Sequence, residues 1–304
     1  MLKTELIKLY FYVCEIYEKE LRWHCERFTK CPVSLSFTDE ELITSYLFTM
    51  SYENKTQVKD VYNYLVRHWS DWFPSLPSYA AYNNRLNKLS SVFAPLAERL
   101  MDKYNSLQST PEQFIRLTDS MPIITCSGKR EGKVALELCD KGYNASKAMY
   151  YYGVKLHGIG FYQSGKLPQM EVLQVSKASE HDLEAQRNLL EKSKGIPVFA
   201  DKAFCDKTLK KQLQDNDSEL LTPVKNKKGQ TIQEKQRNKA ADKLYSTAVS
   251  KIRQPIESFF NWLIQNTDIQ RASKVRSTKG LIVHIFGRIA TALIPKVIQQ
   301  NNLI

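Results

Sequence analysis

The spacing of apolar residues changes near residue 110, and this change divides the chain into two parts with different expected folds. Before it, apolar residues follow the three-four spacing of amphipathic helices, as in Leu6, Leu9, Tyr10, Val13, Tyr17 and Leu21. After it, short apolar segments typical of strands alternate with helical segments, as in a mixed sheet covered by helices. The sequence therefore predicts an all-α domain at residues 1–109 and an α/β domain at residues 110–304.

Helix start signals support the all-α part. Thr38 and Glu41 form a capping-box pattern in front of an apolar run, so a helix is expected to begin there. A second helix is expected from Gln57 to Trp69, because the segment that follows contains two prolines. Ser78 is then placed to cap a third helix.

The helix after Ser78 has a polar face that includes Arg85 and Lys88. Helices of this size joined by short turns are typical of helix-turn-helix DNA readers. We therefore expect a helix-turn-helix-like DNA-binding domain at residues 1–109, with Arg85 and Lys88 contacting DNA. A solvated helix face explains the same residues equally well.

The second part has the pattern of a mixed five-stranded sheet. Strands are expected at residues 114–126, 150–161, 169–177, 196–201 and 219–224. Helices are expected at residues 180–193, 206–214 and 279–300, the last of them packing back on the sheet. The stretch 225–251 carries eight basic residues against two acidic ones, and we interpret it as a mobile loop that runs into a helix and grips phosphate. A solvated surface loop is the alternative.

Three carboxylates lie inside apolar sequence. Asp119 interrupts the first expected strand, Asp201 ends another, and Glu257 lies in an amphipathic stretch. A carboxylate in such surroundings is costly to bury without a partner, and acids from two neighbouring strands and a facing helix can converge to hold Mg²⁺. Taken singly, each aspartate fits a turn cap and the glutamate fits a lysine partner equally well.

The overall charge limits the class of partner. The net charge of +12 and the pI of about 9.3 favour a polyanion, with nucleic acid ahead of an anionic membrane surface. The most apolar segment, 281–294, is interrupted by His284 and Arg288, so no membrane span is expected. The N-terminus lacks the pattern of a signal peptide, and we expect a cytoplasmic protein.

Four short motifs follow one another in the second part. They are Asp119-Ser-Met-Pro122, Tyr152-Gly-Val-Lys-Leu-His157, Ala200-Asp-Lys-Ala-Phe204 and Arg253-Gln-Pro-Ile-Glu-Ser-Phe-Phe260. The acids are separated by 82 residues, from 119 to 201, and by 56 residues, from 201 to 257. With these motifs the sequence resembles the catalytic domain of bacterial insertion-sequence DDE transposases, most closely the insertion-sequence group nine-eighty-two.

The resemblance implies a ribonuclease H-like catalytic domain that performs DNA transposition. Such an enzyme cleaves the ends of its own element and joins the freed 3′-hydroxyls to target DNA. Asp119, Asp201 and Glu257 would be the catalytic residues and the ligands of two Mg²⁺ ions, for which Mn²⁺ can substitute. The expected partners are double-stranded DNA, with terminal inverted repeats and a target, and a second copy of the chain in a homodimeric synaptic complex.

The resemblance also points to DNA-contacting residues. Arg253 would contact phosphate or orient Glu257, and Lys155 and His157 would lie near the DNA backbone, although His157 equally fits a buried histidine in a strand. Lys202 follows the second aspartate and is expected to face phosphate. In the basic stretch, the residues expected to grip phosphate include Lys225, Lys227 and Lys228.

Two departures from the family pattern affect the glutamate motif. Many relatives have a tyrosine and a lysine where this chain has Ser250 and Ile264. Pro255 also falls inside the expected helix, where proline costs roughly 3 kcal/mol. Either the helix is kinked at Pro255, or it starts at Gln254 and Arg253 reaches the site from a loop.

Two further functions compete with a transposase. One is a transposase-derived DNA-binding protein without catalysis, against which the presence of all three acids argues. The other is a nuclease of the same fold that does not transfer strands. The sequence does not specify the end sequence, the target or the cleavage pathway.

Overall fold

The computed structural model describes most of the chain. The described residues are 2–25, 35–109, 114–129, 131–145, 147–225 and 232–300. Contacts divide the chain into two compact units, which we treat separately. Unit 1 comprises Met1–Gln108, Lys133–Glu137 and Leu263–Ile304, and unit 2 comprises Ser109–Gly132 and Leu138–Trp262.

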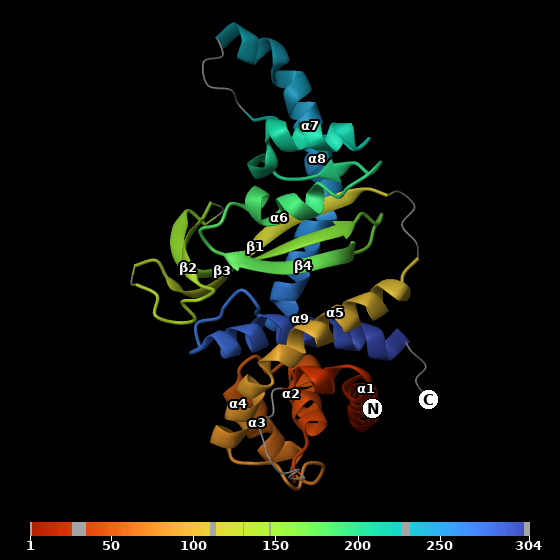
Figure 1. Ribbon diagram of the computed structural model, residues 1–304, viewed down its shortest axis with the longest axis vertical. Coiled ribbons are helices and arrows are strands. Elements are labelled where there is room, and N and C mark those ends of the chain that lie inside the picture. Colours follow the sequence, from red (N-terminus) through yellow and green to blue (C-terminus); the bar gives the residue numbers. More distant parts are fainter. Residues whose placement is uncertain are drawn as a thin grey trace. The chain divides into compact units, whose positions relative to one another are not determined.

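Unit 1 is built from helices (Figure 1). Its N-terminal elements are α1 (Leu2–Lys19), η1 (Leu21–His24), α2 (Asp39–Glu53), α3 (Val58–His68), α4 (Tyr79–Lys88) and α5 (Ser90–Ser106). The predicted capping box is present at the start of α2, where Thr38 and Glu41 exchange side-chain and backbone hydrogen bonds. Ser78 accepts a hydrogen bond from the backbone N–H of Ala81 and so caps α4, as predicted.

The last helix, α9 (Thr278–Gln300), also belongs to unit 1. It packs mainly against α5 and α2, so the expectation that it packs back on the sheet is wrong. Gly287 allows this approach, because a Cβ there would lie 3.0 Å from the Tyr46 ring and 3.3 Å from the Phe93 ring. The length and composition of α9 are those of a membrane span, but 78% of its apolar window is buried within the unit.

Unit 2 contains a mixed sheet (Figure 1). Its strands are β1 (Arg116–Ser127), β2 (Asp140–Asn144), β3 (Met149–Phe161), β4 (Gln169–Lys177), β5 (Val198–Phe199) and β6 (Leu220–Leu221). β1 is antiparallel to β3 and parallel to β5, which in turn is parallel to β6. The described part of the chain thus has one strand more than the five predicted.

The additional strand is β2, which the sequence pattern did not indicate. It pairs with residues 149–153 of β3, and β4 pairs with residues 154–161 on the same strand. Since β1 pairs along the length of β3, β2 and β4 share its other edge one after the other. Among the described residues the sheet therefore has six strands instead of the predicted five, and β4, β3, β1, β5 and β6 lie side by side only near Arg116 and Leu117, where β5 pairs with β1.

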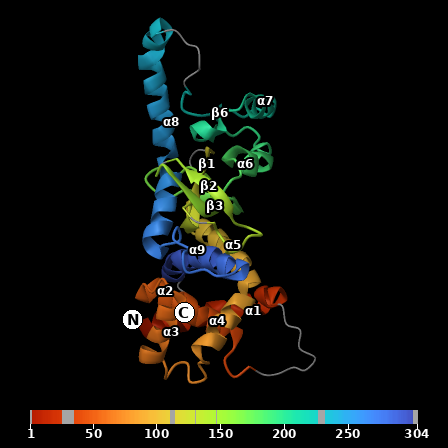
Figure 2. The same cartoon turned by 90° about the vertical axis from the view of Figure 1, so that its left-hand side faces the viewer.

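Helices cover both faces of this sheet (Figure 2). On one face, α6 (Asp182–Leu190) and α7 (Lys207–Asp215) bury their apolar side chains against the sheet. The cluster on this face contains Ile159, Leu183, Leu190, Val198, Ala200, Phe204, Leu209, Leu213 and Leu220. The opposite face is covered by α8 (Ile232–Thr267), whose residues through Trp262 belong to unit 2.

The close approach of α8 to the sheet depends on Gly158 in β3. A Cβ at this position would lie 3.1 Å from the ring of Phe260 in α8 and 2.7 Å from the Met170 side chain. Gly158 is paired directly with Asp119 of β1, and directly opposed residues point to the same face of a sheet. The glycine therefore makes room for α8 beside the Asp119 side chain.

Helix α8 also decides between the two alternatives for Pro255. The helix runs through Pro255 without interruption, so it does not start at Gln254. Arg253 and Glu257 consequently lie one turn apart on the same helix. The basic stretch expected as a loop is helical from Ile232 onward, while residues 226–231, including Lys227 and Lys228, lie outside the described residues.

Candidate active site

The three carboxylates singled out in the sequence surround the guanidinium group of Arg253. Its Nη2 lies 3.0 Å from Oδ2 of Asp119, and its Nη1 lies 3.4 Å from Oε1 of Glu257. The same Nη1 lies 3.9 Å from Oδ1 of Asp201. One buried cation thus contacts three acids that are far apart in the sequence.

The backbone explains why these side chains meet. Leu117 of β1 pairs with Phe199 of β5 in parallel register, so Asp119 and Asp201 each follow a paired residue by two positions. Asp201 directly precedes the short helix η2 (Lys202–Phe204). Glu257 comes from α8, which covers the face of the sheet to which Asp119 points. Two adjacent strands and a helix therefore supply the acids.

The carboxylates differ in their exposure to solvent. The Arg253 side chain is 6% exposed and that of Asp119 is 21% exposed, whereas Asp201 and Glu257 are about half exposed, at 52% and 48%. Burial raises the pKa of Asp119 to about 6, against the opposing effects of Arg253 and of the Ser120 N–H, which donates to Oδ1 at 2.8 Å. The site thus has a partly buried inner acid and two more exposed outer acids.

A single arginine offsets only part of the negative charge of the three carboxylates at this site. Among the described residues, no group of three His, Cys, Asp or Glu side chains is disposed to hold a metal ion. The Nε of Arg253 is buried and has no hydrogen-bond partner within the described part of the chain. The donor set nevertheless fits Mg²⁺ or Mn²⁺, because it consists of carboxylate oxygens that already converge on a positive charge.

His157 lies in the interior, on the face opposite to the acids. Its residue is 1% exposed; Nδ1 lies 3.1 Å from Nε2 of Gln186 and Nε2 lies 2.7 Å from Oγ of Ser176. Since Thr118 donates to the amide oxygen of Gln186, the amide nitrogen donates to His157, which is then the neutral tautomer protonated on Nε2. Burial lowers its pKa to about 4. The expected contact of His157 with the DNA backbone is therefore not supported.

Gln186 and Ser176 are the partners that sequence reasoning did not find. They come from α6 and β4, and no spacing or motif connects them with the histidine. Their hydrogen bonds hold β3, β4 and α6 together directly behind the strand that carries Asp119. They stabilise the scaffold of the site without reaching it.

Some of the basic residues that were predicted to contact DNA are bound to partners within the protein, and others are exposed. Lys155 Nζ donates to the Glu180 carbonyl at 2.7 Å and pairs with Asp182 at 3.0 Å. Arg85 donates to the Phe37 carbonyl and pairs with Asp39 at 2.8 Å. Both are occupied by internal partners, so we do not retain them as DNA contacts. Among the described residues of the predicted set, Lys88, Lys202 and Lys225 are exposed.

A shallow depression on α8 extends from the acid site. Glu257 lines it together with Ser250, Gln254, Lys243 and Lys251. Both lysines are exposed and belong to the basic stretch identified in the sequence. The helix therefore presents cationic and hydroxyl groups directly beside one of the carboxylates.

A comparison with known protein families gave a match that includes the three acids of the site. Residues 111–294 match the family described as transposase DDE domain, a region that includes Asp119, Asp201 and Glu257. Neither the curated proteins nor the solved structures gave a match.

Proposed function

Because the chain belongs to the family of transposases with a DDE domain, we propose that it cleaves the ends of a mobile DNA element and joins the 3′-hydroxyls to target DNA. The family implies a DNA-binding enzyme of the nuclease and transferase class, and its members generally use a divalent metal. The observation that carries the proposal is the convergence of Asp119, Asp201 and Glu257 on the single guanidinium of Arg253.

The proposed catalytic domain is ribonuclease H-like. The support is the strand order β4-β3-β1-β5-β6, with β3 antiparallel to β1 and with β5 and β6 parallel to it. An acid on the central strand and another after its parallel neighbour are consistent with this fold. From the sequence motifs, we also propose that the chain is related to the insertion-sequence group nine-eighty-two.

We propose that Asp119, Asp201 and Glu257 hold the metal ions. When bound, two Mg²⁺ or Mn²⁺ ions supply an activated oxygen nucleophile and stabilisation of the leaving oxygen. Asp119 is the partly buried inner ligand, and the more exposed Asp201 and Glu257 face the incoming DNA. Arg253 offsets part of the charge of the three acids before metal binds and orients Glu257, which lies one turn away.

The proposed DNA path runs along α8. Lys243 and Lys251 beside Glu257, with Lys202 beside Asp201, are exposed cations at the edge of the acid site. Lys225 is a further exposed cation at the start of the basic stretch. The proposed substrates are the terminal inverted repeats of the element and a double-stranded target, bound by a homodimer in the cytoplasm.

The test is strand cleavage of a duplex that contains the DNA flanking the gene, in the presence of Mg²⁺. Wild type should cut at the element end, and Asp201→Asn should not. The matched control is Asp206→Asn, because Asp206 caps α7 through the Leu209 N–H and an asparagine can cap equally well. Equal cleavage by wild type and Asp201→Asn would contradict the proposed catalytic site.

A nuclease without strand transfer is the second candidate function, since the same acids support both reactions. Supplying ends that are already cut, together with a target plasmid, separates the two. A transposase yields joined products, whereas a plain nuclease yields none. A DNA-binding protein without catalysis would give neither cleavage nor joining in these assays.

A further inference from the structure

Unit 1 contains a cavity of about 650 Å³ that is separate from the carboxylate site. It lies where α3 and α4 meet the segment between α8 and α9. We call it the basic groove and define it by Lys59, Asn83, Asn87, Arg271, Lys274 and Arg288, which line it.

The charge of the basic groove is strongly one-sided. Five basic residues line it, namely Lys59, Arg271, Lys274, Arg276 and Arg288, while Asp268 is the only carboxylate among the lining residues. Lys59, Arg271 and Lys274 are exposed, and within the described part of the chain none of these three forms an ion pair with a carboxylate. A groove with such unbalanced cations attracts a polyanion.

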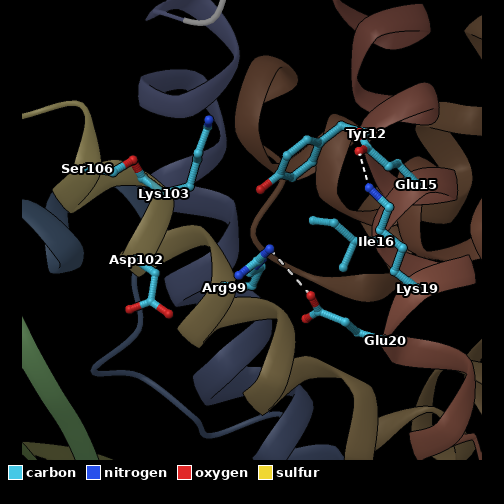
Figure 3. A pocket seen from close by; sticks show the side chains of 9 residues that line it. All are labelled: Tyr12, Glu15, Ile16, Lys19, Glu20, Arg99, Asp102, Lys103 and Ser106. Carbon is cyan, nitrogen blue, oxygen red and sulfur yellow. Dashed lines mark hydrogen bonds and ion pairs between the residues drawn. The ribbon is translucent and has the colours of Figure 1, made fainter.

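A second pocket of unit 1 does not have this excess of basic over acidic residues (Figure 3). That pocket, of about 430 Å³, lies between α1 and α5 and is lined by three acids and three bases. Lys19 pairs with Glu15 at 2.7 Å and Arg99 pairs with Glu20 at 3.4 Å (Figure 3). Its acidic and basic residues are equal in number, so it has no excess positive charge that would attract a polyanion.

The floor of the basic groove is fixed by buried side chains. Arg288 donates to the carbonyls of Thr267 and of Thr56, the latter at 2.5 Å. His284 Nε2 lies 2.8 Å from the carbonyl oxygen of Ile269. These bonds hold the segment after α8 against α9, so the exposed cations are attached to a rigid base.

The rim of the groove is ordered in the same way. Arg276 donates to the carbonyls of Ser273 and Val275, and the Gly280 N–H donates to Oγ of Ser277 at 3.0 Å, which caps the start of α9. A Cβ at Gly280 would lie 3.0 Å from Oδ1 of Asn87, so glycine permits the close packing of α9 on α4. The first turn of α9 adds the positive end of its helix dipole to the same region.

The sequence of the C-terminal part also has an excess of basic residues. Residues 269–304 contain six basic residues and no aspartate or glutamate. Three of the six, Arg271, Lys274 and Arg276, lie within six consecutive residues that form one wall of the groove. The residues on the polar face predicted for α4 have different neighbours. Arg85 pairs with Asp39, whereas Asn83 and Asn87 line the groove.

We propose that the basic groove binds the phosphodiester backbone of double-stranded DNA, as a contact surface separate from the carboxylate site. Lys59, Arg271 and Lys274 make the ionic contacts, and the amide of Asn83 donates hydrogen bonds to phosphate oxygens. The amide nitrogen of Asn87 already donates to the Asn83 carbonyl at 2.8 Å, so Asn87 lines the groove without being assigned a phosphate contact. The contact is to the backbone, because cations carried on this rigid rim fix position without reading bases. The inference rests on DNA as the partner of the proposed function, but not on catalysis.

The experiment measures binding of the full chain to a labelled duplex of mixed sequence over a range of salt concentrations. The variant is the triple substitution Lys59→Ala, Arg271→Ala and Lys274→Ala. Each phosphate contact removed should reduce the slope of log Kobs against log salt by about 0.9. The triple variant should therefore bind more weakly at low salt and depend clearly less on salt.

The matched control removes the same charge elsewhere on unit 1. Lys3, Lys103 and Lys296 are exposed and do not line the groove, so their triple alanine variant should keep the wild-type slope. Thermal melting of both variants tests folding, and superimposable curves are expected because all six side chains are exposed. Equal slopes for the two triple variants, or an unchanged slope in the groove variant, would overturn the proposal.

A second measurement separates this proposal from the proposed function. The groove variant should need more protein than wild type to reach half of its maximal cleavage rate, because its DNA binding is weakened while the carboxylates are untouched. If wild type binds DNA through the groove but never cleaves, the proposed function fails and the groove proposal stands. If cleavage occurs and the groove variant binds like wild type, the groove proposal fails alone.

Discussion

The carboxylate site of unit 2 and the basic groove of unit 1 differ in whether their charged side chains have partners of opposite charge. In the first, three acids share one nearly buried arginine. In the second, three cations stand exposed without a carboxylate partner in the described part of the chain. The difference indicates different occupants: three acids that share one cation keep excess negative charge and attract a metal ion, whereas unpaired surface cations attract an external polyanion.

The largest effect should come from the inner acid. Asp119→Asn is expected to lower cleavage by about a thousandfold, because several kcal/mol of metal-dependent stabilisation is lost and each 1.4 kcal/mol is a factor of ten. Its thermal stability should not fall, because burial raises the pKa of Asp119 to about 6 and a neutral amide suits that position. Cleavage assays and thermal melting test this pair of outcomes, and wild-type activity in the variant would contradict it.

The next effect concerns DNA binding along α8. Replacing Lys225, Lys239, Lys243 and Lys251 with alanine should reduce the salt slope of DNA binding by up to about 0.9 per lysine. All four are exposed and lie in the basic stretch. Combined with the groove variant, the reductions should add, because the two surfaces are separate. An unchanged slope would exclude the stretch as a DNA contact.

A smaller effect is expected on stability. Arg253→Gln removes the cation that the three acids share, and without metal it should destabilise unit 2 by roughly 1–3 kcal/mol. The figure is modest because two of the acids are about half exposed and screened by water. Mg²⁺ should raise the melting temperature more in the variant than in wild type. An equal increase in both would show that the ions do not replace the arginine charge.

The last effect is a dependence of stability on pH. Burial lowers the pKa of His157 to about 4 and that of His284 to about 3, from 6.5 in both cases. Between pH 6.5 and 4 the unfolded chain therefore binds more protons, so stability falls as the pH falls. His157→Gln should reduce this slope in chemical denaturation experiments without abolishing it, because His284 remains. A slope identical to that of wild type would contradict the neutral, buried state of His157.

Local patterns in the sequence predicted several of the elements, and the three acids that they singled out lie together in the structure. The strand carrying Asp119 and the capped starts of α2 and α4 are short-range features that follow from periodicity and capping. The meeting of Asp119 and Asp201 also followed from the expectation of adjacent strands. These are cases in which local preference and global fold agree.

Long-range partners could not be predicted in the same way. α9 has an apolar face that fits either a sheet or helices, and its packing on α5 and α2, with Gly287 against Tyr46 and Phe93, depends on residues far away in the sequence. His157 was equally consistent with a surface and an interior position until Gln186 and Ser176 provided its partners. The basic groove likewise joins segments about 200 residues apart, which no local pattern connects.

The central claim is that Asp119, Asp201 and Glu257 together bind divalent metal. The most direct measurement is a titration of the protein with Mn²⁺, followed by the electron paramagnetic resonance signal of the free ion. Wild type is predicted to bind Mn²⁺, with affinity lost in Asp119→Asn and in Asp201→Asn but retained in Asp206→Asn and in the groove variant. Equal Mn²⁺ binding by wild type, Asp119→Asn and Asp201→Asn would contradict the account.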